Sequence, residues 1–208
     1  MIIAGAGGFA RETLELILQA DDAGIIYFYD DVDPALVKIY DKYEVLKTSD
    51  ALKKALDVDP IFCVGVGGVA ERRKLHDLFV LLGGTPVSIF SPLAIIGENE
   101  ISIGEGSIIA TGTVITTNVT IGIGCLINLN CTIGHDSVIG EFCEFSPGVH
   151  VSGNCTIGNN CAVGTGAVLL PGISLGNNVV IGAGAVVTKN VPDNSIMVGI
   201  PARPLDKK

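Results

Sequence analysis

The sequence lacks several features that define whole classes of protein. It has no tryptophan, only 5% aromatic and 17% charged residues, and no apolar run near the roughly 18 residues of a membrane-spanning helix. Basic residues are scarce: 13 lysines and arginines stand against 22 acidic residues, for a net charge of −9. Such a charge balance excludes neither folding nor catalysis, but it argues against nucleic acid or an anionic membrane surface as partners.

Cysteine and histidine patterns are equally sparse. The six cysteines form no Cys-x-x-Cys pair and the three histidines are scattered, so we expect no bound metal. The first residues have no basic region followed by an apolar core, which indicates no secretory signal. Cysteines without such a signal favour a cytoplasmic protein over a disulfide framework.

Glycine and aliphatic residues, in contrast, are abundant. The 208 residues include 27 glycines, and 48% are hydrophobic. Charge is nearly missing from Gly106 to Thr188, where only Asp136, Glu141 and Glu144 occur. A surface this poor in charge predicts packing against copies of the same chain. The alternative is a polar but uncharged surface, since Asn and Thr are plentiful.

A six-residue period organises the second half of the chain. Every sixth residue from Ile103 to Val187 is large and apolar, a mostly small and never charged residue stands four places later, and glycine often follows the large residue. This period is typical of a parallel β-helix, in which each hexapeptide makes a short strand and a corner. Three hexapeptides close a triangular coil, so the fifteen repeats predict five coils, roughly 24 Å in height at ~4.8 Å per coil. Glycine and asparagine are expected to supply left-handed corner conformations.

The same register explains most of the cysteines. Five of the six occupy the small position of the repeat, namely Cys125, Cys131, Cys143, Cys155 and Cys161. We interpret them as small apolar fillers of the interior, not as metal ligands or nucleophiles.

The first 90 residues alternate between strand and helix patterns. The alternation predicts a small Rossmann-like α/β domain with a parallel sheet. We therefore divide the chain into an α/β domain (1–90), an all-β parallel β-helix (91–192) and a C-terminal tail (193–208). The expected strands are Ile2–Ala4, Ile25–Tyr29, Ile61–Val64 and Pro86–Phe90, and the expected helices are Arg11–Ala20, Ser49–Leu56 with Ser49 as its cap, and Ala70–Leu82.

A glycine-rich turn follows the first expected strand. Gly5-x-Gly7-x-x-Ala10 matches a variant of the dinucleotide fingerprint, whose glycines let backbone N–H groups approach a phosphate at a helix start. Asp30 and Asp31 end the second strand, in place to accept hydrogen bonds from ribose or sugar hydroxyls. The alternative is a tight turn without a ligand, and three strands are few for a nicotinamide site.

One motif within the repeats points to chemistry. His135 follows an interior Ile by two places, which puts it on the outside of the wall, and Asp136 comes next. A histidine with a carboxylate on one ring nitrogen can take a proton on the other, as a general base does. Asp136 serves His135 in its own chain only if the corner turns it outward, because neighbouring strand residues point to opposite faces. The alternative is a solvated His–Asp pair without function.

The whole chain resembles the hexapeptide-repeat sugar acyltransferases, and most of all the sialic acid O-acetyltransferase-like proteins and the bacillosamine-type nucleotide-sugar N-acetyltransferases. Three stretches carry the resemblance: Gly-Ala-Gly-Gly-Phe-Ala at 5–10, Gly-His-Asp-Ser-Val-Ile-Gly at 134–140 and Val-Gly-Ile-Pro-Ala-Arg at 198–203. It implies a left-handed β-helix, a homotrimer and acetyl-CoA in the groove between neighbouring prisms. It also implies that the N-terminal domain holds the sugar or nucleotide sugar.

The resemblance further implies roles for individual residues. His135 matches the catalytic base and Asp136 its acidic helper. The positions implied for acetyl-CoA are Gly153, whose N–H would face the acetyl carbonyl, Thr165, Ala183 and Glu144. Lys189 and Arg203 are expected to bind its phosphates because they are, with Lys207 and Lys208, the only basic residues after residue 90; the alternative is a solvated tail. The positions implied for the sugar nucleotide are Gly7, Gly8, Phe9, Asp30, Asp31, Gly65 and Asn128.

Phe9 and Glu144 stand where many members of this family carry histidine. The expected activity is direct acetyl transfer from acetyl-CoA to the amino group of a nucleotide-linked amino sugar, with His135 as base. O-acetylation of a sialic acid-type sugar is the first alternative, and a β-helix that binds without catalysis is the second. A serine acetyltransferase-like enzyme is disfavoured, because those proteins resemble an all-helical domain where this chain alternates strands and helices.

Overall fold

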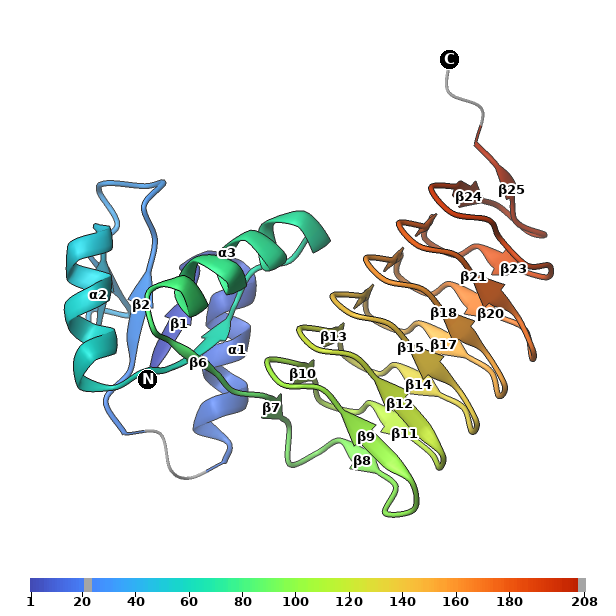
Figure 1. Cartoon of the computed structure of the whole chain (residues 1–208), viewed down its shortest axis with the longest axis horizontal. Helices are drawn as coiled ribbons and strands as arrows, with labels where there is room; N and C mark the ends of the chain where they lie inside the picture. Colours follow the sequence, from blue (N-terminus) through green and yellow to red (C-terminus); the bar gives the residue numbers. More distant parts are fainter. Residues whose placement is uncertain (21–23, 206–208) are drawn as a thin grey trace.

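The computed structural model describes residues 1–20 and 24–205, which form an α/β part and a long prism (Figure 1). The α/β part comprises β1 (Ile2–Ala4), α1 (Gly8–Leu18), β2 (Tyr27–Tyr29), β3 (Lys38–Ile39), β4 (Tyr43–Leu46), α2 (Ser49–Val58), β5 (Ile61–Val64), α3 (Val69–Leu81) and β6 (Thr85–Pro86). In these residues the sheet has the order β3-β4-β2-β1-β5-β6, and every pair except β3–β4 is parallel.

Two apolar layers hold the helices to this sheet. Leu14 and Ile17 of α1 pack with Ile3 and Phe28 on one face, and Leu52 of α2 and Phe79 of α3 pack on the other. Strands alternating with helices on both faces give the α/β architecture that the sequence predicts. The carboxyl ends of β1, β2 and β5 therefore meet at one edge of the sheet.

Local details differ from the sequence-based expectations. Helix α2 is capped by Thr48, whose Oγ1 accepts a hydrogen bond from Ala51 N–H, so the prediction of Ser49 as cap is wrong by one residue. The hairpin β3–β4 escaped prediction. Its turn places Tyr40 and Asp41 at φ of 52° and 54°, without the glycine or asparagine that normally marks such a turn.

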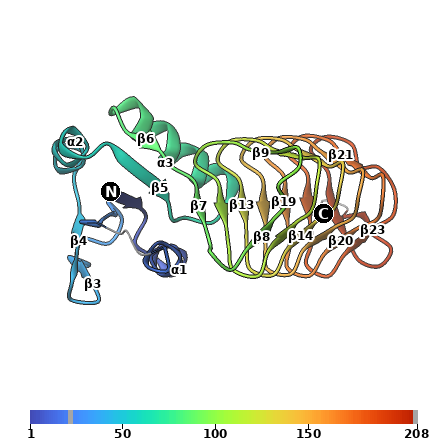
Figure 2. The same ribbon diagram turned by 90° about the horizontal axis from the view of Figure 1, so that it is seen from below.

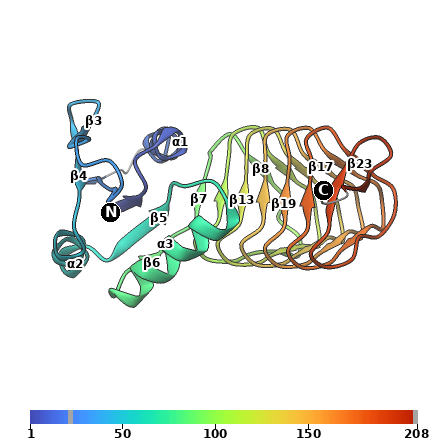
Figure 3. The same cartoon turned by 90° about the horizontal axis from the view of Figure 1, so that it is seen from above.

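The second half of the chain winds into a prism with three faces (Figures 2 and 3). Each face is a sheet of short stacked strands, which are parallel except for the last strand of the first face. The first face comprises β7 (Ile89–Phe90), β10 (Ile108–Ile109), β13 (Leu126–Ile127), β16 (Glu144–Phe145), β19 (Ala162–Val163), β22 (Val180–Ile181), β24 (Ile196–Val198) and β25 (Arg203–Pro204). The second comprises β8 (Ile95–Ile96), β11 (Val114–Ile115), β14 (Thr132–Ile133), β17 (His150–Val151), β20 (Val168–Leu169) and β23 (Val186–Val187). The third comprises β9 (Ile101–Ile103), β12 (Val119–Ile121), β15 (Val138–Ile139), β18 (Thr156–Ile157) and β21 (Ser174–Leu175).

Stacked strands lie three hexapeptides apart, as the pairing of Ile109 with Ile127 and of Ile127 with Phe145 shows. The large residues of the repeat fill the interior, and the five repeat cysteines are buried and free. The prism is the left-handed parallel β-helix that the resemblance implies.

The prism extends beyond the repeats at both ends. The single strand expected at Pro86–Phe90 is divided: β6 joins the α/β sheet, whereas β7 pairs with β10 and opens the prism. At the other end, where the sequence suggested a tail from residue 193, β24 adds in parallel to β22 and β25 folds back antiparallel onto β24. The terminal strands escape the pattern because β24 lies two residues out of the register: Met197 pairs with Ile181, whereas the repeat would place position 199 there.

Two kinds of position build the corners. Left-handed φ values recur every six residues, with Asn, Asp or Gly at most of them and with Glu100 and Phe142 as exceptions. This confirms the expectation that glycine and asparagine supply the left-handed corners, whereas the glycines that follow the large residues have another role. An added Cβ on Gly122 or Gly158 would lie 2.7 Å from the backbone of the next coil, and these glycines therefore allow the coils to stack.

No helix of the described residues is both long and apolar enough to cross a membrane.

Candidate functional site

His135 and Asp136 lie at the corner between β14 and β15, on the outside of the prism. His135 Nδ1 is 2.7 Å from Asp136 Oδ2, and the two side chains are 56% and 46% exposed. Asp136 has a φ of 57°, a left-handed conformation that Asp tolerates. This backbone turn brings two sequential side chains to the same surface, so Asp136 serves His135 within one chain.

A second contact fixes the carboxylate. Asn118, one coil earlier, donates from Nδ2 to Asp136 Oδ1 at 3.1 Å. The hydrogen bond with His135, followed by that from Asn118, lowers the pKa of Asp136 below its usual value. An ionised carboxylate accepts a hydrogen bond from the Nδ1–H of the ring and leaves Nε2 free to accept a proton.

Gly153, one coil later, lies directly against the imidazole. A Cβ at this position would come within 2.6 Å of His135 Nε2, so only glycine leaves room for the ring. The residues at 1–20 and 24–205 provide no acceptor for the Gly153 N–H. A free N–H beside a general base can stabilise negative charge on a carbonyl oxygen.

Two of the other residues predicted to contact acetyl-CoA line a different corner. Thr165 lies between β19 and β20, and Ala183 lies between β22 and β23, so both stand where the first face turns into the second. His135 and Gly153 stand where the second face turns into the third. One chain therefore keeps the two sets on separate corners.

Lys189 and Arg203 come together at the C-terminal end of the prism. They line one cavity of about 350 Å³, which Thr188 and Asn190 also border. Lys207 and Lys208 lie outside the described residues.

The carboxyl edge of the α/β sheet gathers the predicted sugar-nucleotide residues. Gly7 caps α1 without a side chain, no acidic residue stands in the first turn, and a Cβ on Gly7 or Gly8 would touch nothing within 4 Å. Asp30 Oδ1 accepts from the N–H groups of Val32 and Asp33, and Asp31 Oδ2 lies 3.4 Å from Tyr29 Oη. The edge is thus open and carries backbone donors at α1 and carboxylates at β2.

Two further predicted residues share a smaller cavity. Phe9 from α1 and Asn128, just after β13, line a space of about 170 Å³ between the α/β part and the prism. Gly65 has a packing role: a Cβ there would come within 2.8 Å of Ala10 Cα and of the Ile3 side chain.

Glu144 makes a contact that the sequence did not reveal. Its Oε2 accepts hydrogen bonds from Gly68 N–H at 2.6 Å and from Arg72 Nη2 at 3.0 Å. Its role toward acetyl-CoA stays a prediction. Arg72 escaped prediction because a charged residue in an amphipathic helix ordinarily faces water.

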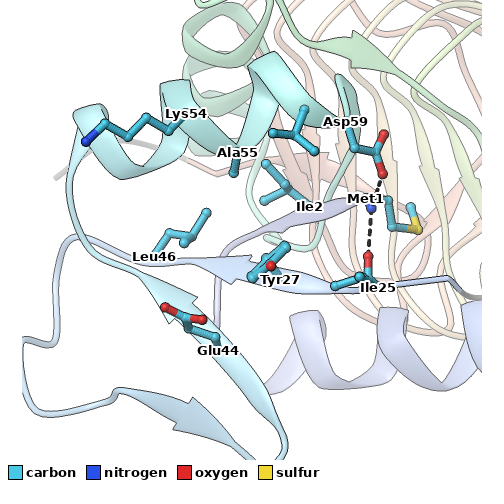
Figure 4. A pocket seen from close by; sticks show the side chains of 10 residues that line it. Met1, Ile2, Ile25, Tyr27, Glu44, Leu46, Lys54, Ala55 and Asp59 are labelled. Atoms are coloured by element: carbon cyan, nitrogen blue, oxygen red, sulfur yellow. Dashed lines mark hydrogen bonds and ion pairs between the residues drawn. The ribbon is translucent and has the colours of Figure 1, made fainter.

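A larger cavity of about 490 Å³ lies elsewhere (Figure 4). It is bordered by Met1, Ile25 and Tyr27 at the start of β1 and β2 and by the end of α2. Ligands of open parallel sheets bind beyond the carboxyl ends of the strands, and this cavity lies at the amino ends. It is therefore separate from the site described above. Among the described residues, no three His, Cys, Asp or Glu side chains are grouped to hold a metal ion.

Comparison with known proteins finds relatives of both parts of the chain. Residues 1–79 match the PglD N-terminal domain, and residues 136–170 and 154–189 match the bacterial transferase hexapeptide (six repeats). The acetyltransferase domain of PglB from Neisseria gonorrhoeae FA1090, solved in complex with acetyl coenzyme A, is 30% identical over 98% of each chain, with a TM-score of 0.90. WeeI from Acinetobacter baumannii AYE is 30% identical over 98% of each chain, with a TM-score of 0.87.

PerB from Caulobacter crescentus, in complex with CoA and GDP-perosamine, is 26% identical over 99% of this chain and 96% of its own, with a TM-score of 0.88. These similarities span the α/β part and the prism together, and not the repeats alone. The chain therefore belongs to the hexapeptide-repeat sugar acyltransferase family.

Proposed function

We propose that this protein transfers the acetyl group of acetyl-CoA to the amino group of a nucleotide-linked amino sugar. The observation that carries the proposal is the His135–Asp136 pair, 2.7 Å apart, with Nε2 free beside the N–H of Gly153. The structural neighbours in complex with acetyl coenzyme A and with GDP-perosamine support the choice of donor and acceptor.

The arrangement suits direct transfer without a covalent enzyme intermediate. His135 Nε2 takes a proton from the amine as its nitrogen attacks the thioester carbon, and Asp136 stabilises the imidazolium that results. The Gly153 N–H donates to the carbonyl oxygen as it gains negative charge. When the C–S bond breaks, the proton on His135 passes to the CoA sulfur, which leaves as a thiol. Buried cysteines take no part in this scheme.

A trimer would complete the site. The corner with Thr165 and Ala183 and the corner with His135 and Gly153 are separate in one chain, and a groove between two prisms would bring one of each together. The low charge of the prism favours such packing, and Val138, Leu170 and Val180 are exposed apolar residues on its surface. We therefore infer a homotrimer with acetyl-CoA between neighbouring subunits.

The phosphates of the two substrates have distinct places in this scheme. Lys189 and Arg203 border the cavity at the C-terminal end of the prism, where they would attract the phosphates of CoA. The nucleotide sugar would lie at the carboxyl edge of the α/β sheet, with a phosphate toward Gly7 and Gly8 and hydroxyl groups toward Asp30 and Asp31. Phe9 and Asn128 would border the sugar. The free cysteines fit a cytoplasmic enzyme.

An assay of CoA thiol release tests the proposal. Purified protein is supplied with acetyl-CoA and with 4-amino and 3-amino nucleotide sugars, GDP-perosamine among them, beside free sialic acid. We expect release with an amino nucleotide sugar and its loss in His135→Ala, with acetyl-CoA binding retained. Turnover with sialic acid alone would assign O-acetylation instead, and bound acetyl-CoA without turnover on any acceptor would contradict the proposed acceptor class.

A further inference from the structure

The glycine-rich loop at residues 65–68 is built into the carboxyl edge of the sheet. It follows β5 and leads into α3, and it packs on the first glycine turn: Gly65 lies against Ala10, and a Cβ on Gly5 would collide with Val66. Whatever holds this loop therefore also shapes the edge at which the nucleotide sugar is proposed to bind.

Glu144 holds the loop from the prism. Gly68 is the N-cap residue of α3, with a φ of 84° and no side chain to satisfy the orphan N–H groups of the helix. The carboxylate of Glu144 caps the helix in place of an N-cap side chain, since Oε2 accepts a hydrogen bond from the Gly68 N–H at 2.6 Å. Its negative charge is also favourable at the amino end of the α3 dipole.

Arg72 completes the contact one turn later. Its side chain is 2% exposed, that of Glu144 is 19% exposed, and Nη2 donates to Glu144 Oε2 at 3.0 Å. Its Nε and Nη1 are buried without a partner among the described residues. Burial lowers the pKa of Arg72, and Glu144 counteracts that shift. The buried charge of the Arg72 guanidinium is therefore stabilised by Glu144, and the same carboxylate binds the loop through Gly68.

A second set of contacts keeps α3 against the same corner. Arg73 lies 3.6 Å from Glu141 and stacks over Phe142, with its Cζ 4.0 Å from the ring centroid. The His76 ring meets Phe142 edge-on at 5.1 Å. Phe142 has a φ of 50°, which a bulky residue rarely adopts. The corner is thus shaped to fit α3.

We propose that Glu144 and Arg72 are a positioning pair, which holds loop 65–68 in the conformation that receives the nucleotide sugar. This proposal rests on the proposed function and assigns to Glu144 a role in acceptor binding, in place of direct contact with acetyl-CoA. Glu144 belongs to β16, which pairs with β13 just before Asn128, so the pair fixes the loop relative to the wall that borders the sugar.

The test separates the two substrates kinetically. Glu144→Gln keeps the shape and an acceptor for Gly68 N–H but leaves Arg72 without its counter-charge; Arg72→Met removes the charge itself. We expect each variant to raise the KM for GDP-perosamine, or for the best nucleotide sugar of the panel, about tenfold, and to leave the KM for acetyl-CoA within about twofold. The double variant should lose little more than either single one, because both remove one interaction. Glu98→Gln, an exposed acid on the prism, is the matched control and should behave as wild type.

Amide exchange at Gly68 provides a second measurement that needs no turnover. We expect the Gly68 N–H to be protected in the wild type and to exchange at least about tenfold faster in Glu144→Ala, which removes the acceptor. A raised KM for acetyl-CoA with an unchanged KM for the nucleotide sugar would overturn the proposal, as would two unchanged KM values. A wild type inactive on all amino nucleotide sugars would refute the proposed function and the substrate role of the loop, while exchange at Gly68 would still report the contact by itself.

Discussion

Replacement of Gly153 by alanine tests whether catalysis depends on the position of the His135 ring. The new Cβ would lie 2.6 Å from Nε2 and 2.7 Å from Cε1, whereas ordinary contacts begin at 3.4 Å. The ring must therefore move by about 1 Å, and a displacement of that size at a reacting group costs roughly 10²-fold in rate. This corresponds to about 2.7 kcal/mol of transition-state stabilisation.

Stability should change little in the same variant. The collision involves the far end of a side chain that is 56% exposed, so the imidazole can swing into solvent without disturbing the coils. Gly153 also lies outside the left-handed region, so alanine adds no backbone strain. We expect kcat to fall roughly 10²-fold while the free energy of unfolding changes by less than about 1 kcal/mol.

A double-mutant cycle with His135→Ala makes the reasoning refutable. If Gly153→Ala acts through the ring, it should have little further effect once the ring is absent. Initial rates with acetyl-CoA and the preferred acceptor, and denaturant unfolding of all four proteins, are the measurements. A kcat within about threefold of the wild type, or an equal loss on the His135→Ala background, would show that the tight fit does not set the position of the base.

Three other predictions follow from the same structure. Gly158→Ala would place a Cβ 2.7 Å from the backbone of Gly176, so the free energy of unfolding, measured with denaturant, should fall by roughly 1–3 kcal/mol. An unchanged free energy of unfolding would contradict the stacking role of this glycine. Because the folded pKa of Asp136 lies below its usual value, its contacts with His135 and Asn118 stabilise the folded state above the usual pKa of an aspartate, and this stability is lost as the pH falls through the lowered pKa; the free energy of unfolding lost in Asp136→Asn should therefore be smaller at about pH 3 than at about pH 7, and a loss that does not shrink toward low pH would refute this. Lys189→Ala should weaken acetyl-CoA binding about tenfold in calorimetry and reduce its salt dependence, whereas Lys53→Ala, an exposed lysine of α2, should leave both unchanged.

Much of the proposed catalytic pair could be predicted from sequence. The register places His135 two residues after an interior Ile, which fixes its outward direction from local geometry alone. The orientation of Asp136 could not be predicted in the same way, because alternation along a strand points it inward. The left-handed φ at Asp136 reverses that outcome, and the asparagine one coil earlier then fixes its carboxylate.

The contacts between the α/β part and the prism were beyond sequence reasoning. Glu144 and Arg72 are 72 residues apart, and neither has a neighbour in sequence that hints at the other. A buried arginine cannot be distinguished from an exposed one by helical periodicity, since the element that covers it comes from elsewhere in the chain.

The sequence by itself determined the prism, because the repeat is local: each hexapeptide needs one large interior residue, one small residue and one residue able to turn the corner. It determined the alternation of strands and helices in the first half for the same reason. Only the tertiary structure decided which residues meet between coils and between the two parts. The stacking register brings Gly153 under His135, and the packing of α3 on the prism brings Arg72 to Glu144. Both depend on distances between segments far apart along the chain, which no local pattern specifies.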